Sequence, residues 1–257
     1  MEEKVFIKNS KGLKLALIIF SPDKNKKYPA IIILNGFLGY KEELHPAELA
    51  KKLVNNGFTA VRFDCSGSGE SEGAFEKDYS MSNYLEDIKC VYEYVQKLEF
   101  VDKNRIGVLG YSLGGMMAIV FAAQHSEIKT CIAVSTPPTI FAANWLKMFL
   151  KDWRYIEFFN REIPKATKKI KLPVTLIMEA NKFNVLNFIP KVNCPFLMIL
   201  GLADELVSPD DSRKIFKKAN QPKELIEIEG LGHEHKLYPE KIKIVNEKTL
   251  DFLKRYL

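Results

Sequence analysis

The pattern of apolar and polar positions divides the chain into segments of two kinds. Apolar runs of strand length, which we expect to form strands, lie at 4–8, 13–20, 30–34, 58–63, 106–111, 131–135, 196–200 and 224–228. Stretches whose apolar residues recur at helical spacing lie at 43–56, 84–98, 116–123, 210–218 and 240–257. Strands that alternate with helices imply a parallel sheet covered by helices on both faces. The sequence therefore predicts an α/β fold, a doubly wound and mostly parallel sheet that begins with an edge hairpin.

One segment, residues 137–190, interrupts this alternation and contains both tryptophans, Trp145 and Trp153. Four of its apolar residues recur at the spacing of one helical face: Phe141, Trp145, Met148 and Phe149. We expect a cap inserted into an α/β core that consists of residues 1–136 and 191–257. The two tryptophans are candidate substrate-binding residues that would line an apolar pocket, and packing of the cap onto the core is the alternative explanation for them.

The composition is that of a globular protein with one hydrophobic core. Of the 257 residues, 47% are hydrophobic and 27% are charged, which suffices for one domain with an insertion. The net charge of +6 comes from lysine, whereas arginine occurs at only six positions. Because nucleic-acid-binding surfaces rely on clustered arginine, we expect no nucleic acid partner.

Cysteine usage and hydropathy narrow the expected location. The four cysteines are widely spaced and form no C-x-x-C pair, which indicates reduced thiols rather than disulfides or a zinc site. The amino terminus has no charged-then-apolar signal region, and no apolar stretch approaches the length of a membrane span. We expect a cytoplasmic protein without stable membrane insertion, present as a monomer or homodimer.

The candidate nucleophile lies where the run Ile106–Gly115 changes from strand to helical character. Gly110-Tyr111-Ser112-Leu113-Gly114 fits the G-x-S-x-G pattern of a nucleophile elbow, in which two glycines let the backbone reverse tightly and expose the serine hydroxyl. So short a pattern often occurs by chance, and the neighbouring sequence gives it its weight. An apolar strand precedes it, and the apolar run Met116–Ala123 follows. We therefore take Ser112 as the candidate nucleophile.

The pattern occurs a second time, in Gly69-Glu70-Ser71-Glu72-Gly73. Two carboxylates flank this serine and would oppose the formation of an alkoxide, and no apolar helix follows it. We expect this copy to be a solvated loop.

A serine hydroxyl becomes nucleophilic when a base takes its proton, and imidazole can do so near neutral pH. Ligands of a parallel α/β sheet gather where its strands end, and His233 follows the last predicted strand in Gly230-Leu231-Gly232-His233. His45 and His125 fall in or at the end of predicted helices, and His235 is the main alternative. We expect His233 to be the base.

A carboxylate must orient that base, and two backbone N–H groups must stabilise the oxyanion. Asp204 follows the strand at 196–200 in a loop that can aim it, with its neighbour Glu205 as the alternative. The order Ser112, Asp204, His233 is typical of α/β hydrolases and differs from the chymotrypsin and subtilisin orders. The N–H groups of Leu113, at the start of the elbow helix, and of Phe37, in the loop after the third strand, are the expected oxyanion hole.

With these residues placed, nearly the whole chain resembles the α/β-hydrolase fold family. It is most similar to the small-capped branch of feruloyl and cinnamoyl esterases, monoacylglycerol-lipase-like enzymes and serine aminopeptidase-like hydrolases. The stretches that carry the resemblance include Asn35-Gly-Phe-Leu-Gly39, Arg62-Phe-Asp-Cys-Ser-Gly-Ser-Gly-Glu-Ser71, Gly201-Leu-Ala-Asp204 and the elbow. That branch usually has histidine where this chain has Asn35. Because the oxyanion donor is a backbone group, the asparagine is expected to preserve catalysis.

The resulting hypothesis is a serine carboxylesterase that acts on a small-molecule ester through an acyl-enzyme, with short to medium acyl groups or aromatic acyl groups. No metal ion or organic cofactor is expected. A thioesterase or an aminopeptidase-like hydrolase would use the same triad, although the basic character of the 137–190 segment counts against binding of a substrate ammonium group. A non-catalytic binding protein with a hydrolase fold is the alternative of another class.

Overall fold

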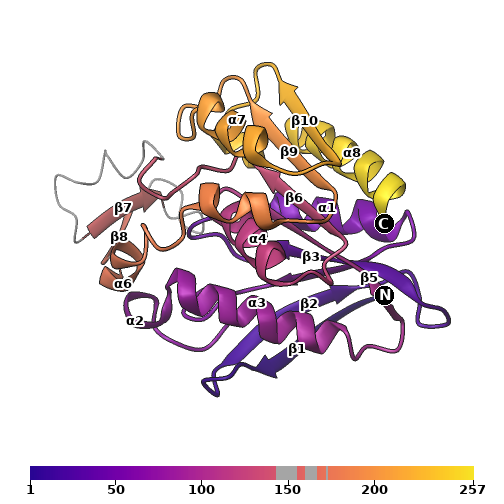
Figure 1. The fold of residues 1–257 in the computed structure, drawn as a ribbon. Coiled ribbons are helices and arrows are strands. Elements are labelled where there is room, and N and C mark those ends of the chain that lie inside the picture. Colours follow the sequence, from indigo (N-terminus) through magenta and orange to yellow (C-terminus); the bar gives the residue numbers. More distant parts are fainter. Residues whose placement is uncertain (143–154, 160–166, 172) are drawn as a thin grey trace.

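A computed structural model of the chain describes residues 1–142, 155–159, 167–171 and 173–257. Its centre is an eight-stranded sheet in the order β1-β2-β4-β3-β5-β6-β9-β10 (Figure 1). The strands are β1 (Glu2–Lys8), β2 (Lys14–Phe20), β3 (Tyr28–Leu34), β4 (Thr59–Phe63), β5 (Val101–Tyr111), β6 (Thr130–Val134), β9 (Phe196–Gly201) and β10 (Lys223–Ile228). Strand β2 pairs antiparallel with β1 and β4, and all other neighbours are parallel. The predicted mostly parallel sheet with its edge hairpin is confirmed.

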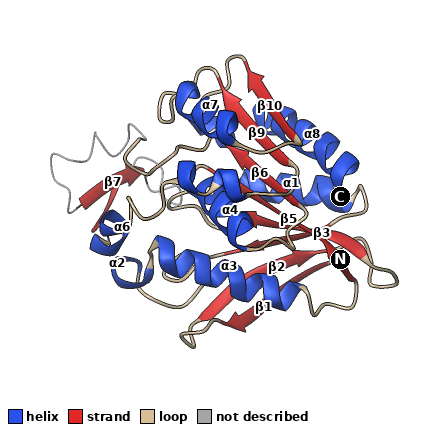
Figure 2. Cartoon of the chain, viewed as in Figure 1, coloured by secondary structure: helices blue, strands red, loops and turns tan. Residues whose placement is uncertain are grey.

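Helices cover both faces of this sheet, as Figure 2 shows. One face carries α1 (Leu44–Val54) and α8 (Pro239–Tyr256), and the other carries α3 (Met81–Val95), α4 (Leu113–Gln124) and α7 (Pro209–Lys218). Successive side chains of a strand point to opposite faces, and β3 shows this clearly. Ile31 and Ile33 pack with the α1 and α8 side, whereas Ile32 and Leu34 pack with the α3 and α4 side. A strand buried on both faces is why 30–34 is a continuous apolar run.

Two helices that flank the site show how the sequence defines them. Every residue of α4 from Leu113 to Ala122 is buried, which accounts for an apolar run without an amphipathic pattern. Helix α3 begins three residues before the predicted start at Tyr84, because the Ser80 side chain accepts a hydrogen bond from the Asn83 N–H at 3.1 Å and caps the helix.

The 137–190 segment contributes no strand to the main sheet among its described residues. It contains a separate antiparallel pair, β7 (Tyr155–Phe159) with β8 (Thr167–Lys171), then α6 (Val174–Met178) and the 3-10 turns η2 (Val185–Asn187) and η3 (Ile189–Lys191). Phe141, the first residue of the predicted helical face, lies in a turn. Trp145, Met148, Phe149 and Trp153 lie outside the described residues. The division into core and cap remains a prediction.

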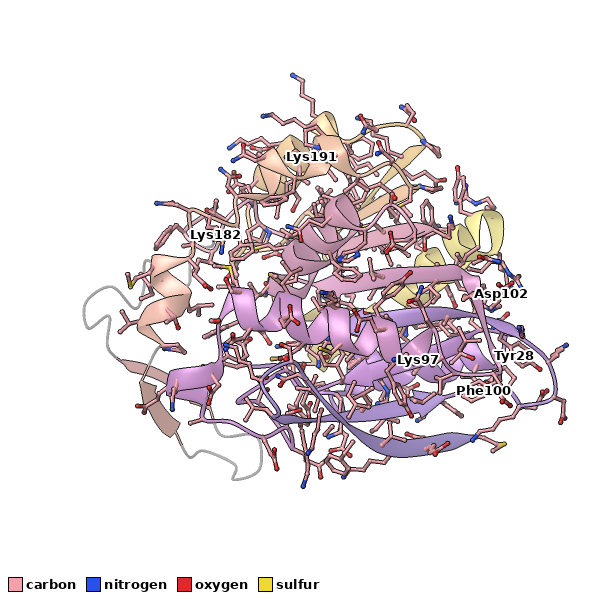
Figure 3. All side chains as sticks on the ribbon, turned by 60° about the horizontal axis from the view of Figure 1, so that its bottom comes forward. Tyr28, Lys97, Phe100, Asp102, Lys182 and Lys191 are labelled. Atoms are coloured by element: carbon pink, nitrogen blue, oxygen red, sulfur yellow. The ribbon has the colours of Figure 1, made fainter. Side chains whose placement is uncertain are left out.

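The amino ends of β3 and β5 lie far from this segment. The Tyr28 N–H donates to the Phe100 carbonyl at 2.9 Å, and Figure 3 shows both residues beside Asp102, with Lys182 and Lys191 at a distance from them. The β7–β8 pair lies at the end of the molecule opposite the two termini (Figure 1). None of the described helices is long and apolar enough to cross a membrane.

Candidate active site

The predicted strand, sharp turn and helix are present at Ser112. Strand β5 ends at Tyr111, helix α4 begins at Leu113, and Ser112 between them has φ 51° and ψ −114°. A non-glycine residue with positive φ is strained and must be held by its surroundings. The Ser112 N–H donates to the Val134 carbonyl at 2.8 Å, which fixes the turn against β6.

The two glycines of the elbow are required by close backbone approach. A Cβ on Gly110 would overlap the backbone of Gly114, and a Cβ on Gly114 would overlap the carbonyl oxygens of Leu34 and Asn35. The elbow is therefore pressed against the end of β3. This is the tight reversal that the G-x-S-x-G pattern predicts.

Among the described residues, two further non-glycine residues have positive φ, and both lie at the same edge of the sheet as Ser112. Leu38 (φ 59°) is in the loop after β3, and Ser135 (φ 47°) directly follows β6. Strained backbone concentrates at functional sites, so these three residues mark the carboxyl edge as the place where the fold is most constrained. No residue-type pattern in the sequence pointed to Leu38 or Ser135.

The structure brings the predicted base and acid together. His233 Nδ1 lies 2.9 Å from Asp204 Oδ2, and Asp204 Oδ1 accepts the N–H groups of Leu206 at 3.0 Å and Val207 at 2.8 Å. The carboxylate, whose side chain is 2% exposed, is thus held in one orientation. Because an ionised carboxylate only accepts hydrogen bonds, the proton lies on Nδ1, and Nε2 of His233 is left as an acceptor.

The alternative residues, His235 and Glu205, lie in different surroundings. The ring of His235 is buried, and its Nδ1 contacts the Gly232 carbonyl at 3.2 Å. Burial lowers the pKa of His235 to about 4, so it stays neutral at pH 7. Glu205 is exposed and lines an open depression beside His233. The predicted first choices, Asp204 and His233, are in direct contact with each other.

Ring contacts place the His233 loop next to the elbow. The 3-10 turn η4 (His233–Leu237) carries His235, whose ring centroid lies 6.2 Å from that of Tyr111. Tyr111 immediately precedes Ser112 and also packs edge-on against His45 at 4.3 Å. The Ala203 N–H donates to the Leu231 carbonyl at 3.1 Å and joins the Asp204 loop to the same region.

The loop after β3 lies against the elbow on its other side. A Cβ on Gly36 would be 3.3 Å from the Tyr111 carbonyl oxygen and 3.6 Å from Ser112 Cβ, so the residue before Phe37 touches the candidate nucleophile. The Phe37 ring packs against Phe75 and Tyr79, with centroid distances of 6.2 and 5.7 Å. The predicted oxyanion residues, Phe37 and Leu113, therefore flank Ser112.

A small apolar cavity opens beside Ser112. Its volume is about 10 Å³, which is room for one water-sized or methyl-sized group. The core and the 137–190 segment both contribute to the lining: Phe37, Ser112, Leu113, Met116, Pro137, Ile140 and Leu176. The predicted substrate-binding residues, Trp145 and Trp153, lie outside the described residues.

Asn35 has a structural role at this edge. Its Nδ2 donates to the Phe63 carbonyl at 2.9 Å, and its own carbonyl accepts from Tyr84 Oη at 3.0 Å. The side chain thus joins the end of β3 to the end of β4 and keeps the following loop in place.

Comparison with known proteins identifies the family. The model of the prolyl oligopeptidase family matches residues 47–257. The chain belongs to this family. The match includes Ser112, Asp204 and His233 and begins after the loop that carries Phe37.

Proteins similar to this prolyl oligopeptidase family member include α/β hydrolases. It is 26% identical to Est1E of Butyrivibrio proteoclasticus, solved with ferulic acid bound, with a TM-score of 0.80 and 98% of each chain covered. The α/β hydrolase GrgF of a Penicillium species has a TM-score of 0.82 at 22% identity, covering 100% of this chain and 99% of its own. The 2,6-dihydropseudooxynicotine hydrolase of Paenarthrobacter nicotinovorans is 25% identical over 206 residues, which are 76% of this chain and 49% of that protein. The chain is thus a hydrolase of the α/β fold.

The second G-x-S-x-G copy of this family member corrects one expectation. Glu72 is exposed, and Glu70 is 43% exposed, as a solvated loop requires, but Ser71 is buried. Its Oγ donates to the Asp64 carbonyl at 2.6 Å and accepts the Ala16 N–H at 2.9 Å. The serine holds the loop against β2, a contact between distant segments that the local sequence does not reveal.

Three acidic residues near His233 were not predicted from the sequence as a group. Glu205, Glu234 and Glu240 line the depression beside His233, together with Lys241. Glu234 directly follows the predicted base, His233, and Glu240 lies in the first turn of α8. Their nearness to His233 in the sequence was the signal that could have indicated this acidic group.

Proposed function

We propose that the chain is a serine hydrolase that cleaves carboxylic esters through an acyl-enzyme. The observation that carries the proposal is the pairing of Asp204 with His233 at 2.9 Å at the sheet edge where Ser112 occupies a strained elbow. The acid then holds the base in the tautomer that accepts a proton, which is what an elbow serine requires.

In this mechanism Ser112 Oγ attacks the ester carbonyl while Nε2 of His233 takes its proton. The negative charge that develops on the carbonyl oxygen is stabilised by the N–H groups of Phe37 and Leu113. The imidazolium of His233, stabilised by Asp204, returns the proton to the departing alcohol. Water then attacks the acyl-enzyme by the same route and releases the carboxylic acid.

The proposed aromatic acyl groups rest on a relative, and the proposed short acyl groups rest on the cavity. Est1E binds ferulic acid, a carboxylic acid, and the cavity beside Ser112 is apolar along the side chains of Met116 and Ile140. We infer esters with short to medium acyl groups or aromatic acyl groups.

The deciding experiment measures hydrolysis of p-nitrophenyl esters from acetyl to lauroyl by the wild type and by Ser112→Ala. We expect activity that the variant loses, and a fluorophosphonate adduct that mass spectrometry maps to Ser112. An adduct on Ser71, or full activity of Ser112→Ala, would refute the assignment. If the protein is folded but inactive on every ester, the remaining hypotheses are a thioesterase and a non-catalytic binding protein.

A second candidate function is release of amino-terminal residues from peptides. The family match and the acidic lining of the depression beside His233 favour it, because carboxylates there would bind a substrate ammonium group. Aminoacyl p-nitroanilides test it: hydrolysis that exceeds that of matched esters, and that falls in Glu234→Gln, would replace the esterase by the peptidase.

A further inference from the structure

A buried ion pair joins the loop that carries Phe37 to the loop after β4. Lys41 is 1% exposed and Asp64 is 0% exposed. Lys41 Nζ lies 2.8 Å from Asp64 Oδ2, and the Lys41 N–H donates to Asp64 Oδ1 at 2.7 Å. The carboxylate therefore binds both the side chain and the backbone of one residue.

The chain encloses this carboxylate. The Glu70 N–H donates to Asp64 Oδ2 at 2.9 Å, and Gly69 has φ 53°, with a Cβ there overlapping the carboxylate. Arg62 Nη1 donates to the Lys41 carbonyl at 2.8 Å. Glu70 also accepts from Lys41 Nζ. The backbone N–H groups of Lys41 and Glu70 thus hold the Asp64 carboxylate in one orientation.

The pair is not explained by stability alone. Burial by itself would lower the pKa of Lys41, yet the hydrogen bonds to Asp64 and Glu70 outweigh it and raise that pKa, so the ammonium stays charged. Buried ion pairs pay a desolvation cost, and apolar replacements are often as stable. A buried pair is therefore better explained by the geometry that it enforces.

That geometry concerns the short loop between β3 and α1. Before Phe37, Asn35 Nδ2 binds the Phe63 carbonyl at 2.9 Å. After it, the Gly39 carbonyl accepts from Ser68 Oγ at 3.2 Å, and Lys41 binds Asp64. Phe37 thus lies between anchors that all connect to the end of β4 or the loop after it.

We propose that Lys41 and Asp64 are positioning residues that hold the Phe37 N–H where the oxyanion forms. The inference rests on the proposed function, since it presumes that this N–H stabilises the tetrahedral intermediate. An oxyanion donor contributes only when it is in place beforehand, and losing one lowers kcat by about 10² to 10³. A loop anchored at one end only would misplace the donor.

The test compares Lys41→Met with Glu70→Gln, which removes only the exposed partner of the same lysine. We expect Lys41→Met to lower kcat by about ten- to one-hundred-fold with KM within about threefold, and Glu70→Gln to lower kcat by less than about threefold. Butylboronic acid, which forms a tetrahedral adduct on an active serine, should lose affinity for Lys41→Met by the same factor as kcat.

Controls separate positioning from stability. Val245→Ala, which truncates a buried side chain of α8 that belongs neither to the ion pair nor to the loop, should keep the kcat of the wild type at a temperature where both are folded. Unchanged kcat in Lys41→Met, or an equal loss in Val245→Ala, would overturn the proposal. If Lys41→Met does not fold, Ser68→Ala tests the neighbouring anchor, with a fall in kcat of about two- to fivefold expected and no fall contradicting it.

Failure of the proposed function has a different signature. If the wild type lacks esterase activity or Ser112→Ala keeps it, the serine mechanism is wrong whatever Lys41 does. If the wild type is active through Ser112 and the Lys41→Met and Ser68→Ala variants keep its kcat, only the positioning role is wrong.

Discussion

Asp204 selects the tautomer of His233, and an amide at this position would reverse that choice. An asparagine could keep its oxygen on the N–H groups of Leu206 and Val207, so its NH2 would face Nδ1. That ring nitrogen would have to accept, and Nε2 would carry the proton and could not take one from Ser112. We expect Asp204→Asn to lower kcat on p-nitrophenyl acetate by about 10³ to 10⁴.

The matched control for Asp204→Asn is Glu205→Gln. Glu205 is exposed, and its amide variant should keep kcat within about threefold of the wild type. Near-normal activity of Asp204→Asn, combined with a large loss in Glu205→Gln, would exchange the roles of the two carboxylates.

His235 makes stability depend on pH. Its pKa is about 4 in the folded protein, because of burial, against 6.5 when unfolded. The folded state thus binds fewer protons, so stability is complete above pH 6.5 and is lost as pH falls toward 4. The free energy of unfolding should fall by roughly 2 to 3 kcal/mol from this residue between about pH 7.5 and 4.5.

Urea unfolding at the two pH values measures this dependence. The comparison is with His235→Gln, which has no titrating ring and should lose less stability on acidification by that amount. An equal acid loss in both proteins would show that other groups account for it, such as Glu70, whose pKa the hydrogen bonds from Lys4 and Lys41 lower to about 2.

At the scale of elements, the elbow requires direct contact between the backbone atoms of β5, of α4 and of the end of β3. A methyl group on Gly114 would overlap the Leu34 and Asn35 carbonyls, and overpacking of this kind costs about 1 to 3 kcal/mol or more. We expect Gly114→Ala to lower both the free energy of unfolding and kcat, because either the helix or the loop carrying Phe37 must move.

The control for Gly114→Ala is Gly12→Ala, in the β1–β2 turn. Gly12 has φ 81° and open space around it, so alanine there should cost only about 1 to 2 kcal/mol of backbone strain and leave kcat unchanged. If Gly114→Ala had the milder effect on urea unfolding and kept kcat, the close approach of these three elements would not matter for the site.

The elements that could be predicted are those whose packing leaves a periodic pattern. The buried strands 30–34 and 196–200 read as apolar runs because both faces are covered. Helix α3 began earlier than predicted, since its start depends on the Ser80 cap rather than on periodicity. The β7–β8 pair and α6 were not predicted, because these elements of five residues show neither an uninterrupted apolar run nor a helical period.

At the scale of the whole molecule, the site is assembled from loops that a parallel sheet gathers at one edge. This rule made Asp204 and His233 predictable, since each follows a strand. The Lys41–Asp64 pair and the burial of Ser71 were not predictable, because they depend on contacts between loops distant in sequence. The choice of His233 over His235 could be made from the sequence, and the buried ring of His235 supports it.

The cavity beside Ser112 makes substrate choice a property of the whole molecule, because Met116 comes from the core and Ile140 and Leu176 come from the 137–190 segment. Its volume of about 10 Å³ admits little more than a methyl group, which narrows the proposed range of acyl groups to its short end. We expect kcat/KM for p-nitrophenyl esters to be highest for acetyl or propionyl and to fall by about tenfold or more by hexanoyl.

Leu176→Ala should enlarge this cavity and shift the optimum toward longer acyl groups. Leu176 is 1% exposed, whereas Met178 in the same short helix α6 is 77% exposed, so Met178→Ala removes a comparable side chain without touching the cavity. The ratio of hexanoyl to acetyl kcat/KM should rise by about tenfold in Leu176→Ala, since each methylene group fitted into an apolar pocket contributes about 1 to 3 kcal/mol, and should stay constant in Met178→Ala. A wild type that prefers lauroyl, or equal ratios in the two variants, would mean that the acyl group binds elsewhere and that this cavity does not select the substrate.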